Sequence, residues 1–348
     1  MTTAPTGCGA YEILGVLGEG AMGVVYRAHD RATGRHAALK IIEPHPELGI
    51  PEPELRGRFR REVEMLRRVR SPRVVEIYES GELDDGRMWL AMELAPGTAL
   101  DTMLTTHGPL PPKRVMAIGL DVAEALAEVH RAGMVHRDVK PGNVVVAPRG
   151  DGSDSAKLVD FGVARALVGA AGKSSERLTM TGMVLGSLGY MAPEQSGGAS
   201  DPSPTIDVYA LGVTLFELAT GRLPFEGPTA AAFAMQHRQS PVPRLAKILG
   251  ETRDVLALEA VVLRAMAKDP LVRQSDGGSL AREIAAALQI DPAVRATADR
   301  VKARVAEVAR EADVAAPRAR RRLTPGRVAA ALAAMLAIAT MVWGVIKP

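Results

Sequence analysis

Two short stretches of the chain carry the residue types that phosphoryl transfer requires. The first reads His-Arg-Asp-Val-Lys-Pro-Gly-Asn over residues 136–143, so a carboxylate, an ammonium and an amide lie within one loop. The second reads Asp-Phe-Gly over residues 160–162 and adds a second carboxylate. The reaction needs a base near the attacking hydroxyl, oxygen ligands for Mg²⁺ and cations on the moving phosphate. Each residue pair alone is common in turns, but the ordered set favours this chemistry.

A third stretch, residues 18–25, follows the pattern G-x-G-x-x-G-x-V. Gly18, Gly20 and Gly23 would let the backbone approach phosphate oxygens and present its N–H groups to them. Dinucleotide-binding folds share the pattern, but there it opens a helix. Here Val-Val-Tyr-Arg-Ala follows, which favours a loop between two strands. Lys40 ends the next apolar run and either holds phosphates or lies on an exposed strand edge.

In this order the motifs resemble those of the eukaryotic-like Ser/Thr protein kinases, most closely the bacterial membrane-anchored, receptor-type members. The resemblance covers about residues 11–290. It implies an α+β bilobal fold, with a β-rich N-lobe at about 11–96 and an α-rich C-lobe at about 97–290. It also implies ATP as the phosphate donor, Mg²⁺ or its substitute Mn²⁺ as the metal, and protein Ser/Thr hydroxyls as acceptors in bacterial signal transduction.

The resemblance implies a role for each matching residue. Catalysis would use Asp138 as the base, Lys140 on the transferring phosphate, and Lys40 paired with Glu62 on the α/β-phosphates. The metal ligands would be Asn143 and Asp160. The nucleotide would contact Leu17, Gly18, Gly20, Gly23, Val25, Ala38, Lys40, Met92, Glu93, Leu94 and Val145, where Met92 is gatekeeper-like and Glu93 and Leu94 form the adenine hinge.

Further positions match the family's activation and support elements. Glu194 closes the activation segment and is expected to pair with Arg273, while Asp207 is expected to brace the catalytic loop. Thr179 and Thr181 resemble the paired autophosphorylation sites of the bacterial family. A phosphothreonine there would supply an anion for the arginine beside the catalytic base.

The strands and helices that position these residues are predicted from the glycines that interrupt the chain and from the spacing of its apolar residues. The pattern predicts three strands within 11–42, a helix at about 54–69, two more strands at 74–80 and 88–94, and helices at 115–130, 206–220, 255–268 and 279–288. Strands therefore dominate the first part of the chain and helices the second. This division predicts two lobes.

The C-terminal part changes in composition. Residues 291–327 form an Arg/Ala-rich juxtamembrane segment, and 328–346 contain no charge. At about 1.5 Å per residue, 328–346 are long enough for a transmembrane helix; a buried packing helix is the alternative. A Val/Ala heptad stripe at 294–312 predicts either a coiled coil or an amphipathic helix on the large lobe. A homodimer would then form through 294–312 or the kinase domain.

Bulk properties exclude some classes of function. The chain is 47% hydrophobic and 24% charged, as globular proteins are, and its net charge of +3 gives no indication of nucleic-acid binding. The single cysteine excludes an intramolecular disulfide, and the first ten residues lack a signal peptide. We therefore expect a single-pass membrane protein with a cytoplasmic kinase domain, in contact with inner-membrane lipid through 328–346. For the activity, a pseudokinase scaffold and a small-molecule phosphotransferase are the alternatives to an active protein kinase.

Overall fold

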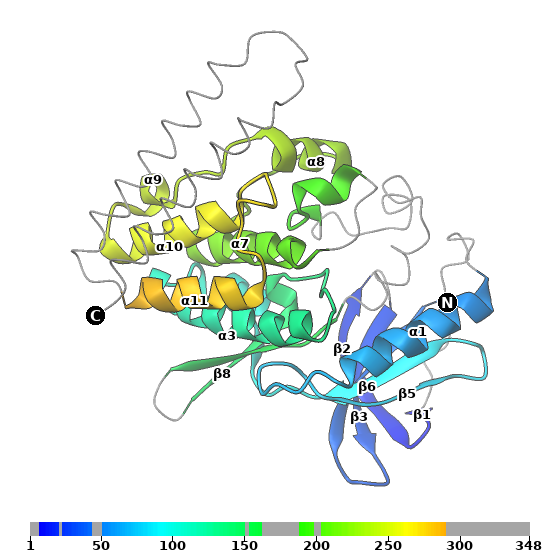
Figure 1. Cartoon of the computed structure of the whole chain (residues 1–348). Helices are drawn as coiled ribbons and strands as arrows, with labels where there is room; N and C mark the ends of the chain where they lie inside the picture. The colour runs from blue at the N-terminus through cyan, green and yellow to red at the C-terminus, as the bar shows by residue number, and fades with distance from the viewer. Residues whose placement is uncertain are drawn as a thin grey trace. The chain divides into compact units, whose positions relative to one another are not determined.

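The computed structural model describes residues 7–20, 23–43, 51–149, 153–161, 188–197 and 203–289. These all belong to one contact unit, Met1–Gln289, and the second unit, Ile290–Pro348, lies outside the described residues. Strands gather in the N-terminal part of the first unit and helices in its C-terminal part (Figure 1). The bilobal α+β prediction is confirmed for this unit.

An antiparallel sheet forms the N-terminal part, with the strand order β1-β2-β3-β4-β6-β5 among the described residues. Its strands are β1 (Gly7–Cys8), β2 (Tyr11–Gly20), β3 (Gly23–Asp30), β4 (His36–Ile42), β5 (Ile77–Glu82) and β6 (Met88–Glu93). The turn between β3 and β4 is closed by Asp30, whose side chain accepts the N–H groups of Ala32 and Thr33. This local hydrogen bonding is the reason that Asp favours turns.

One helix, α1 (Glu52–Leu66), accompanies this sheet and lies beside β5. Its buried residues Phe59, Val63 and Leu66 recur at helical spacing, which is the stripe that the sequence predicts. The helix begins at Pro51–Glu52, where a proline in the first turn costs no hydrogen bond. This helix carries Glu62.

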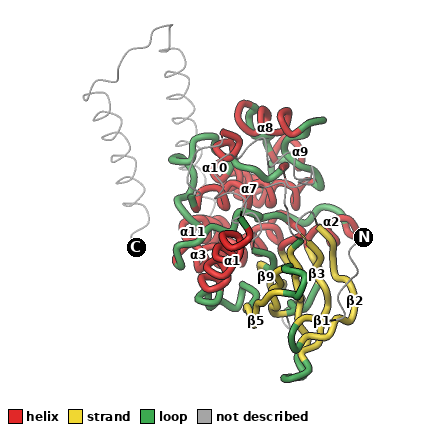
Figure 2. Tube along the Cα trace, turned by 90° about the vertical axis from the view of Figure 1, so that its right-hand side faces the viewer, coloured by secondary structure: helices red, strands yellow, loops and turns green. Residues whose placement is uncertain are grey.

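Several helices of the C-terminal part pack around α7 (Pro204–Thr220). Besides α7, this part contains α2 (Leu100–His107), α3 (Pro112–Arg131), α8 (Ala230–Gln239), α9 (Leu245–Leu249), α10 (Arg253–Ala265) and α11 (Gly277–Leu288). Nearly every side chain of α7 is buried, so this helix is covered on all sides. Figure 2 shows these helices in red, grouped apart from most of the yellow strands.

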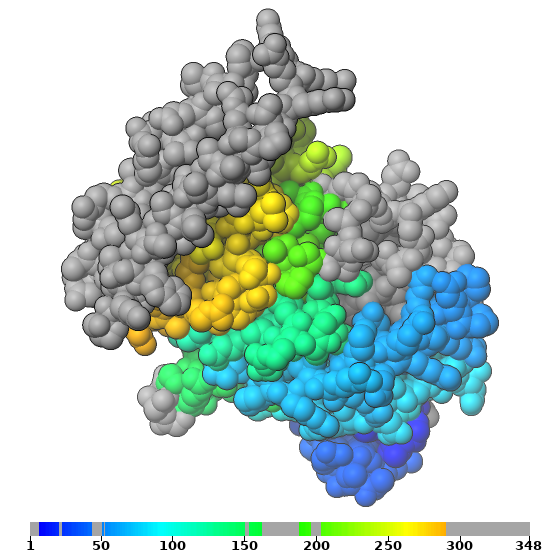
Figure 3. Space-filling model, in the orientation of Figure 1, coloured from blue at the N-terminus to red at the C-terminus, as the bar shows by residue number. Residues whose placement is uncertain are grey.

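A second, smaller sheet carries the residues that lead into the active site. Its antiparallel strands are β7 (Thr98–Ala99), β8 (Val144–Pro148) and β9 (Asp154–Leu158). The backbone of Leu158 donates to the Arg73 carbonyl at 2.8 Å and accepts the N–H of Val75 at 3.1 Å. The small sheet is thereby fastened to the segment that follows α1. In Figure 3 the blue and cyan surface of the first part adjoins the green surface of the second.

The sequence located the long elements and missed the short ones. The predicted strands and helices named above all occur, with ends shifted by a few residues. The sequence analysis did not predict β1, α2, α8, α9 or the small sheet. These elements are short, and a short apolar run lacks a distinctive period.

Candidate active site

The glycine-rich stretch forms the hairpin between β2 and β3, as predicted. Gly20 pairs with Gly23, and Gly18 pairs with Val25. A Cβ on Gly23 would lie 1.9 Å from the carbonyl oxygen of Ile41, and its φ is +136°, so only glycine fits there. A Cβ on Gly18 would meet no protein atom within 4 Å. The fold therefore requires Gly23, whereas Gly18 leaves open space that a phosphate group can enter.

Three expected nucleotide contacts share one face of the large sheet. Val25 lies directly across from Lys40, and Ala38 precedes Lys40 by two residues on β4. Cross-strand partners and residues two apart project to the same side of a sheet. Leu17 lies at a register shift of β2 and is 50% exposed. An apolar surface and one cation are thus brought to the same face.

Lys40 does not pair with the expected residue. Its Nζ lies 2.7 Å from both carboxylate oxygens of Asp160, and Lys40 is only 9% exposed. A buried ammonium needs an anionic partner, and Asp160 occupies that place. Among the described residues, Glu62 on α1 forms no ion pair. The structure therefore does not bring the predicted Lys40–Glu62 pair together.

Asp138, Lys140 and Asn143 form one cluster. Lys140 Nζ lies 2.9 Å from Asp138 Oδ2, and Asn143 Nδ2 donates to the same oxygen at 2.9 Å. Asn143 Nδ2 also donates to the main-chain carbonyl of Asp138 at 2.7 Å. The amide thus fixes both the backbone and the side chain of Asp138. A carboxylate oriented in this way can receive a proton from a hydroxyl that comes within hydrogen-bond reach.

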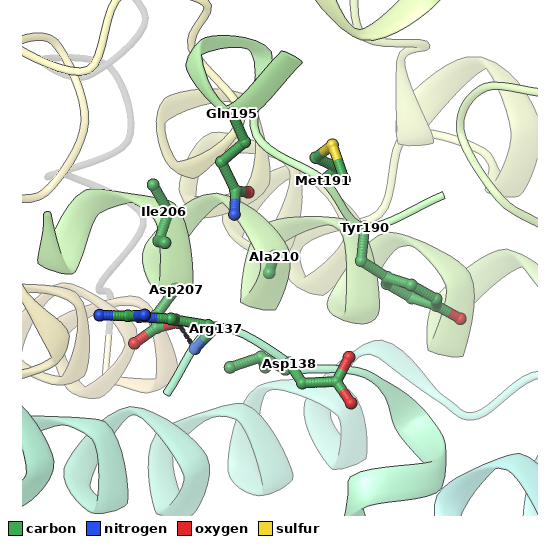
Figure 4. Close-up of a pocket in the computed structure, with 9 residues that line it drawn as sticks. Arg137, Asp138, Tyr190, Met191, Gln195, Ile206, Asp207 and Ala210 are labelled. Carbon is green, nitrogen blue, oxygen red and sulfur yellow. Dashed lines mark hydrogen bonds between the residues drawn. The ribbon is translucent and has the colours of Figure 1, made fainter. Parts of the chain in front are cut away.

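Asp207, in the first turn of α7, braces the catalytic loop as predicted. It is 1% exposed, and its two oxygens accept the N–H groups of His136 at 2.7 Å and Arg137 at 2.8 Å. Arg137 has a φ of +67°, which is uncommon for a residue with a side chain. Figure 4 shows Asp207 beside Arg137, with Asp138 next in the chain. The buried carboxylate holds the backbone turn that presents Asp138.

His130 completes this support, and the sequence analysis missed it. Its Nε2 lies 2.9 Å from Asp207 Oδ2, and its Nδ1 accepts the N–H of Gly277 at 3.0 Å. Because Nδ1 is an acceptor, the proton is on Nε2 and the ring donates to Asp207. One imidazole therefore joins α3, α7 and the N-terminus of α11. A lone histidine inside a helical pattern carries no signal for this role.

His136 is buried and packs on the aromatic ring of Phe161, with ring centroids 5.1 Å apart. Burial lowers the pKa of His136 below its usual value, against the opposing charge of Asp207. Its Nδ1 accepts the N–H of Asp138 at 3.3 Å. A neutral imidazole thus links the catalytic loop to the Asp-Phe-Gly stretch.

The expected adenine hinge begins at Glu93, the last residue of β6. Met92 is buried and pairs with Ala38, and Glu93 and Leu94 come next in the chain. Lys157 of β9 forms an ion pair with Glu93 at 2.5 Å. In the β8–β9 register, Lys157 lies across from Val145, the expected floor of the adenine site. The ion pair thus ties the hinge to the strand pair that carries Val145. The sequence analysis did not identify Lys157.

The segment 188–197 also borders Asp138. Tyr190, Met191 and Gln195 line a small pocket together with Asp138 (Figure 4). The segment is anchored by Arg273, which bonds to both carboxylate oxygens of Glu194 at 2.6 and 2.8 Å. Bidentate pairs of this kind are strong and directional. The predicted Glu194–Arg273 pair is confirmed.

The predicted metal ligands fit Mg²⁺ by donor type. The main-chain N–H of Val159 donates to the carbonyl of Asn143 at 3.0 Å, so Asn143 lies next to the segment that ends in Asp160. Asn143 uses its Nδ2 on Asp138, which leaves the amide oxygen as the ligand atom. One carboxylate and one amide suit Mg²⁺, which usually keeps waters and phosphate oxygens as its other ligands. The described residues contain no cluster of three or more His, Cys, Asp or Glu side chains that could hold a metal alone.

Several predictions fall outside the described residues. These are the phosphorylation sites Thr179 and Thr181, the segment 294–312 and the span 328–346. Within the described part of the chain, no helix combines the length and apolar character that crossing a membrane requires.

Comparisons with known proteins agree with this arrangement. The family model described as protein kinase domain matches residues 11–305. The serine/threonine-protein kinase PrkC of Bacillus subtilis is 36% identical over 283 residues, which are 81% of this chain and 41% of PrkC. The serine/threonine-protein kinase PknD of Mycobacterium tuberculosis is 37% identical over 273 residues, or 78% of this chain and 39% of PknD. The chain thus aligns with less than half of either relative.

A solved structure shows the same fold. The crystal structure of the PknI kinase domain from Mycobacterium tuberculosis has 29% sequence identity to this chain and a TM-score of 0.61. The match covers 83% of this chain and 100% of that domain. The similarity therefore extends across both lobes.

Proposed function

Because the chain belongs to the protein kinase family, we propose that it transfers the γ-phosphate of ATP to Ser and Thr hydroxyls of proteins. The observation that carries this proposal is the cluster of Asp138, Lys140 and Asn143 on a loop braced by Asp207. The names of the relatives, all serine/threonine-protein kinases, support the choice of acceptor.

The residues of this cluster divide the tasks of the reaction between them. Bound ATP with Mg²⁺ supplies the phosphoryl group and neutralises its charge. Asp138 receives the proton of the acceptor hydroxyl, and Asn143 keeps that carboxylate oriented. Lys140, 2.9 Å from Asp138, is placed to stabilise negative charge that develops on the transferring group.

Lys40 and Asp160 would change partners when the nucleotide binds. In the structure, Lys40 Nζ lies 2.7 Å from Asp160 Oδ1. In the proposed complex Lys40 binds the α/β-phosphates, and Asp160 and Asn143 hold the metal. Glu62 would then serve as the anion for Lys40, which requires α1 to approach β4. An ammonium that loses one carboxylate in a partly buried site needs another charge partner.

The test is transfer of labelled phosphate from ATP with Mg²⁺ to protein acceptors by the purified chain. Asp138→Asn should lower the rate by at least about a hundredfold, the scale of a lost general base, without altering the fold. Asp254→Asn, at a solvent-facing ion pair of 3.7 Å, is the matched control and should keep the wild-type rate. Near-normal transfer by Asp138→Asn would refute the assignment, and nucleotide binding without any transfer by the wild type would favour a pseudokinase.

We further propose that Thr179 and Thr181 are autophosphorylated and activate the enzyme. A phosphothreonine would add an anion that Arg137, the residue before Asp138, can bind. Replacing both threonines with Ala should lower the rate on added acceptors while ATP affinity stays unchanged. Mass spectrometry of the wild-type protein after incubation with ATP identifies the modified positions.

For location, we propose that 328–346 span the bacterial inner membrane with the kinase domain in the cytoplasm. The support is the uncharged stretch itself, preceded by the arginines of 318–327. The full chain should sediment with membranes and resist extraction by high salt, whereas a chain that ends near Ala316 should not. Release by salt would instead indicate arginines bound to lipid head groups.

A further inference from the structure

An ion pair between β9 and the end of β6 takes no part in the proposed chemistry. Lys157 Nζ lies 2.5 Å from Oε1 of Glu93, the last residue of β6. The exposed fractions of the two side chains are 21% and 25%. A partly buried pair is screened less by salt than a pair on the open surface. The pair can therefore hold its two strands at a fixed separation.

Glu93 is also bound to the segment that precedes β5. Its main-chain N–H donates to the Glu76 carbonyl at 2.8 Å, and its Oε2 accepts the N–H of Glu76 at 3.2 Å. The carboxylate therefore uses one oxygen on Glu76 and the other on Lys157. Because both oxygens are bound, the side chain of Glu93 has a defined orientation.

Together these contacts form a closed triangle that joins β9, the end of β6 and the segment before β5. Val75 donates its main-chain N–H to the Leu158 carbonyl at 3.1 Å, and the next residue, Glu76, is bound to Glu93. The ion pair of Lys157 with Glu93 closes the triangle. If this pair is removed, β9 and the end of β6 stay connected through the segment before β5, but they can turn relative to each other.

The triangle adjoins the expected adenine site. Lys157 is directly across from Val145, the expected floor, and residues opposite each other in an antiparallel pair project to the same face of the sheet. Glu93 begins the expected hinge, and Leu94 follows it. The ion pair therefore connects the strand pair that carries the floor with the hinge, and the adenine ring of ATP would enter between these two.

We propose that Lys157 is a positioning residue for ATP: its ion pair with Glu93 holds the hinge and the floor at the separation that the adenine ring fills. This inference rests on the proposed function. The main-chain bonds of Leu158 to Arg73 and Val75 do not depend on the ion pair, so they should keep the chain that leads to Asp160 in place without it. The loss of Lys157 should therefore weaken ATP binding and spare the transfer step.

The test compares Lys157→Met, which nearly keeps the length of the side chain and removes its charge, with Glu93→Gln, which removes the opposite charge. The KM for ATP and kcat are measured with a Ser/Thr peptide selected from a degenerate library with the wild-type chain. Calorimetry gives the Kd for a non-hydrolysable ATP analogue. Each variant should raise the KM and the Kd about fivefold and keep kcat within about twofold, the pattern of lost uniform binding. The double variant should raise them no further, because both changes remove the same pair.

Arg114→Met is the matched control, because it breaks another partly buried ion pair of β9, the one of 2.6 Å with Asp154. It should leave the KM, the Kd and kcat unchanged. An unchanged Kd in Lys157→Met, an equal rise in Arg114→Met, or additive rises in the double variant would overturn the inference. If Lys157→Met does not fold, Glu93→Gln and the control decide the result. A wild-type chain that binds the analogue but phosphorylates no acceptor overturns the proposed function instead, and the Kd values still test Lys157.

Discussion

Asp207→Asn tests whether one buried carboxylate sets the catalytic loop. Oδ2 of Asp207 accepts from His136 N–H at 2.7 Å and His130 Nε2 at 2.9 Å, and Oδ1 accepts from Arg137 N–H at 2.8 Å. Asparagine has one acceptor oxygen. If this oxygen takes the place of Oδ2, the hydrogen bonds from His136 and His130 remain. The side-chain NH₂ group then takes the place of Oδ1 and faces the N–H of Arg137, which loses its acceptor.

The expected cost follows from that single lost bond. One buried donor without a partner destabilises the fold by about 1–3 kcal/mol. A chain of this size should lose about 2–4 °C in Tm for each kcal/mol. The bond also holds Arg137 at its φ of +67°, so its loss lets the loop relax and displaces Asp138. A displacement of about 1 Å is enough to lower kcat about a hundredfold.

The assay measures Tm, kcat and the KM for ATP side by side. Glu259→Gln is the control, because Glu259 is also fully buried and accepts from Arg244 and from the Ala246 N–H, away from the loop. It should lower Tm by a similar amount and leave kcat unchanged. If Asp207→Asn lowers Tm but keeps more than half of the wild-type kcat, Asp207 supports the fold and not the orientation of the loop.

Two further predictions concern stability. Burial lowers the pKa of Lys268 from 10.5 to about 8. Between pH 8 and 10.5 the unfolded chain therefore binds one more proton than the folded chain, so the free energy of unfolding should rise with pH in this range. Denaturation measured as a function of pH should show a smaller rise for Lys268→Met. Gly277→Ala should lower Tm by an amount equal to about 1–3 kcal/mol, because its Cβ would lie 2.5–2.7 Å from the α3 backbone. Gly278→Ala, with its nearest neighbours at 3.3 and 3.6 Å, should cost less, and equal Tm values for both would refute the packing argument.

The sequence alone determined the chemistry of the site and the long elements. Asp138, Lys140 and Asn143 lie within six residues, so their proximity follows from local chain geometry. The same holds for the glycines of the β2–β3 hairpin, where the pattern of residue types itself selects the turn. Apolar periodicity located α3 and α7 because a helix that must bury one or more faces repeats that requirement along its length.

Only the tertiary structure decided which distant groups meet. Lys40 and Asp160 are 120 residues apart, and nothing local distinguishes Asp160 from Glu62 as the partner of Lys40. His130 reaches Asp207 across 77 residues and Gly277 across 147. The hydroxyl of Tyr209 on α7 likewise meets Nδ1 of His237 on α8, 28 residues further along the chain. A side chain's hydrogen-bond partner and protonation depend on what the packed core places within about 3 Å of it, and the order of residues along the chain does not contain that distance.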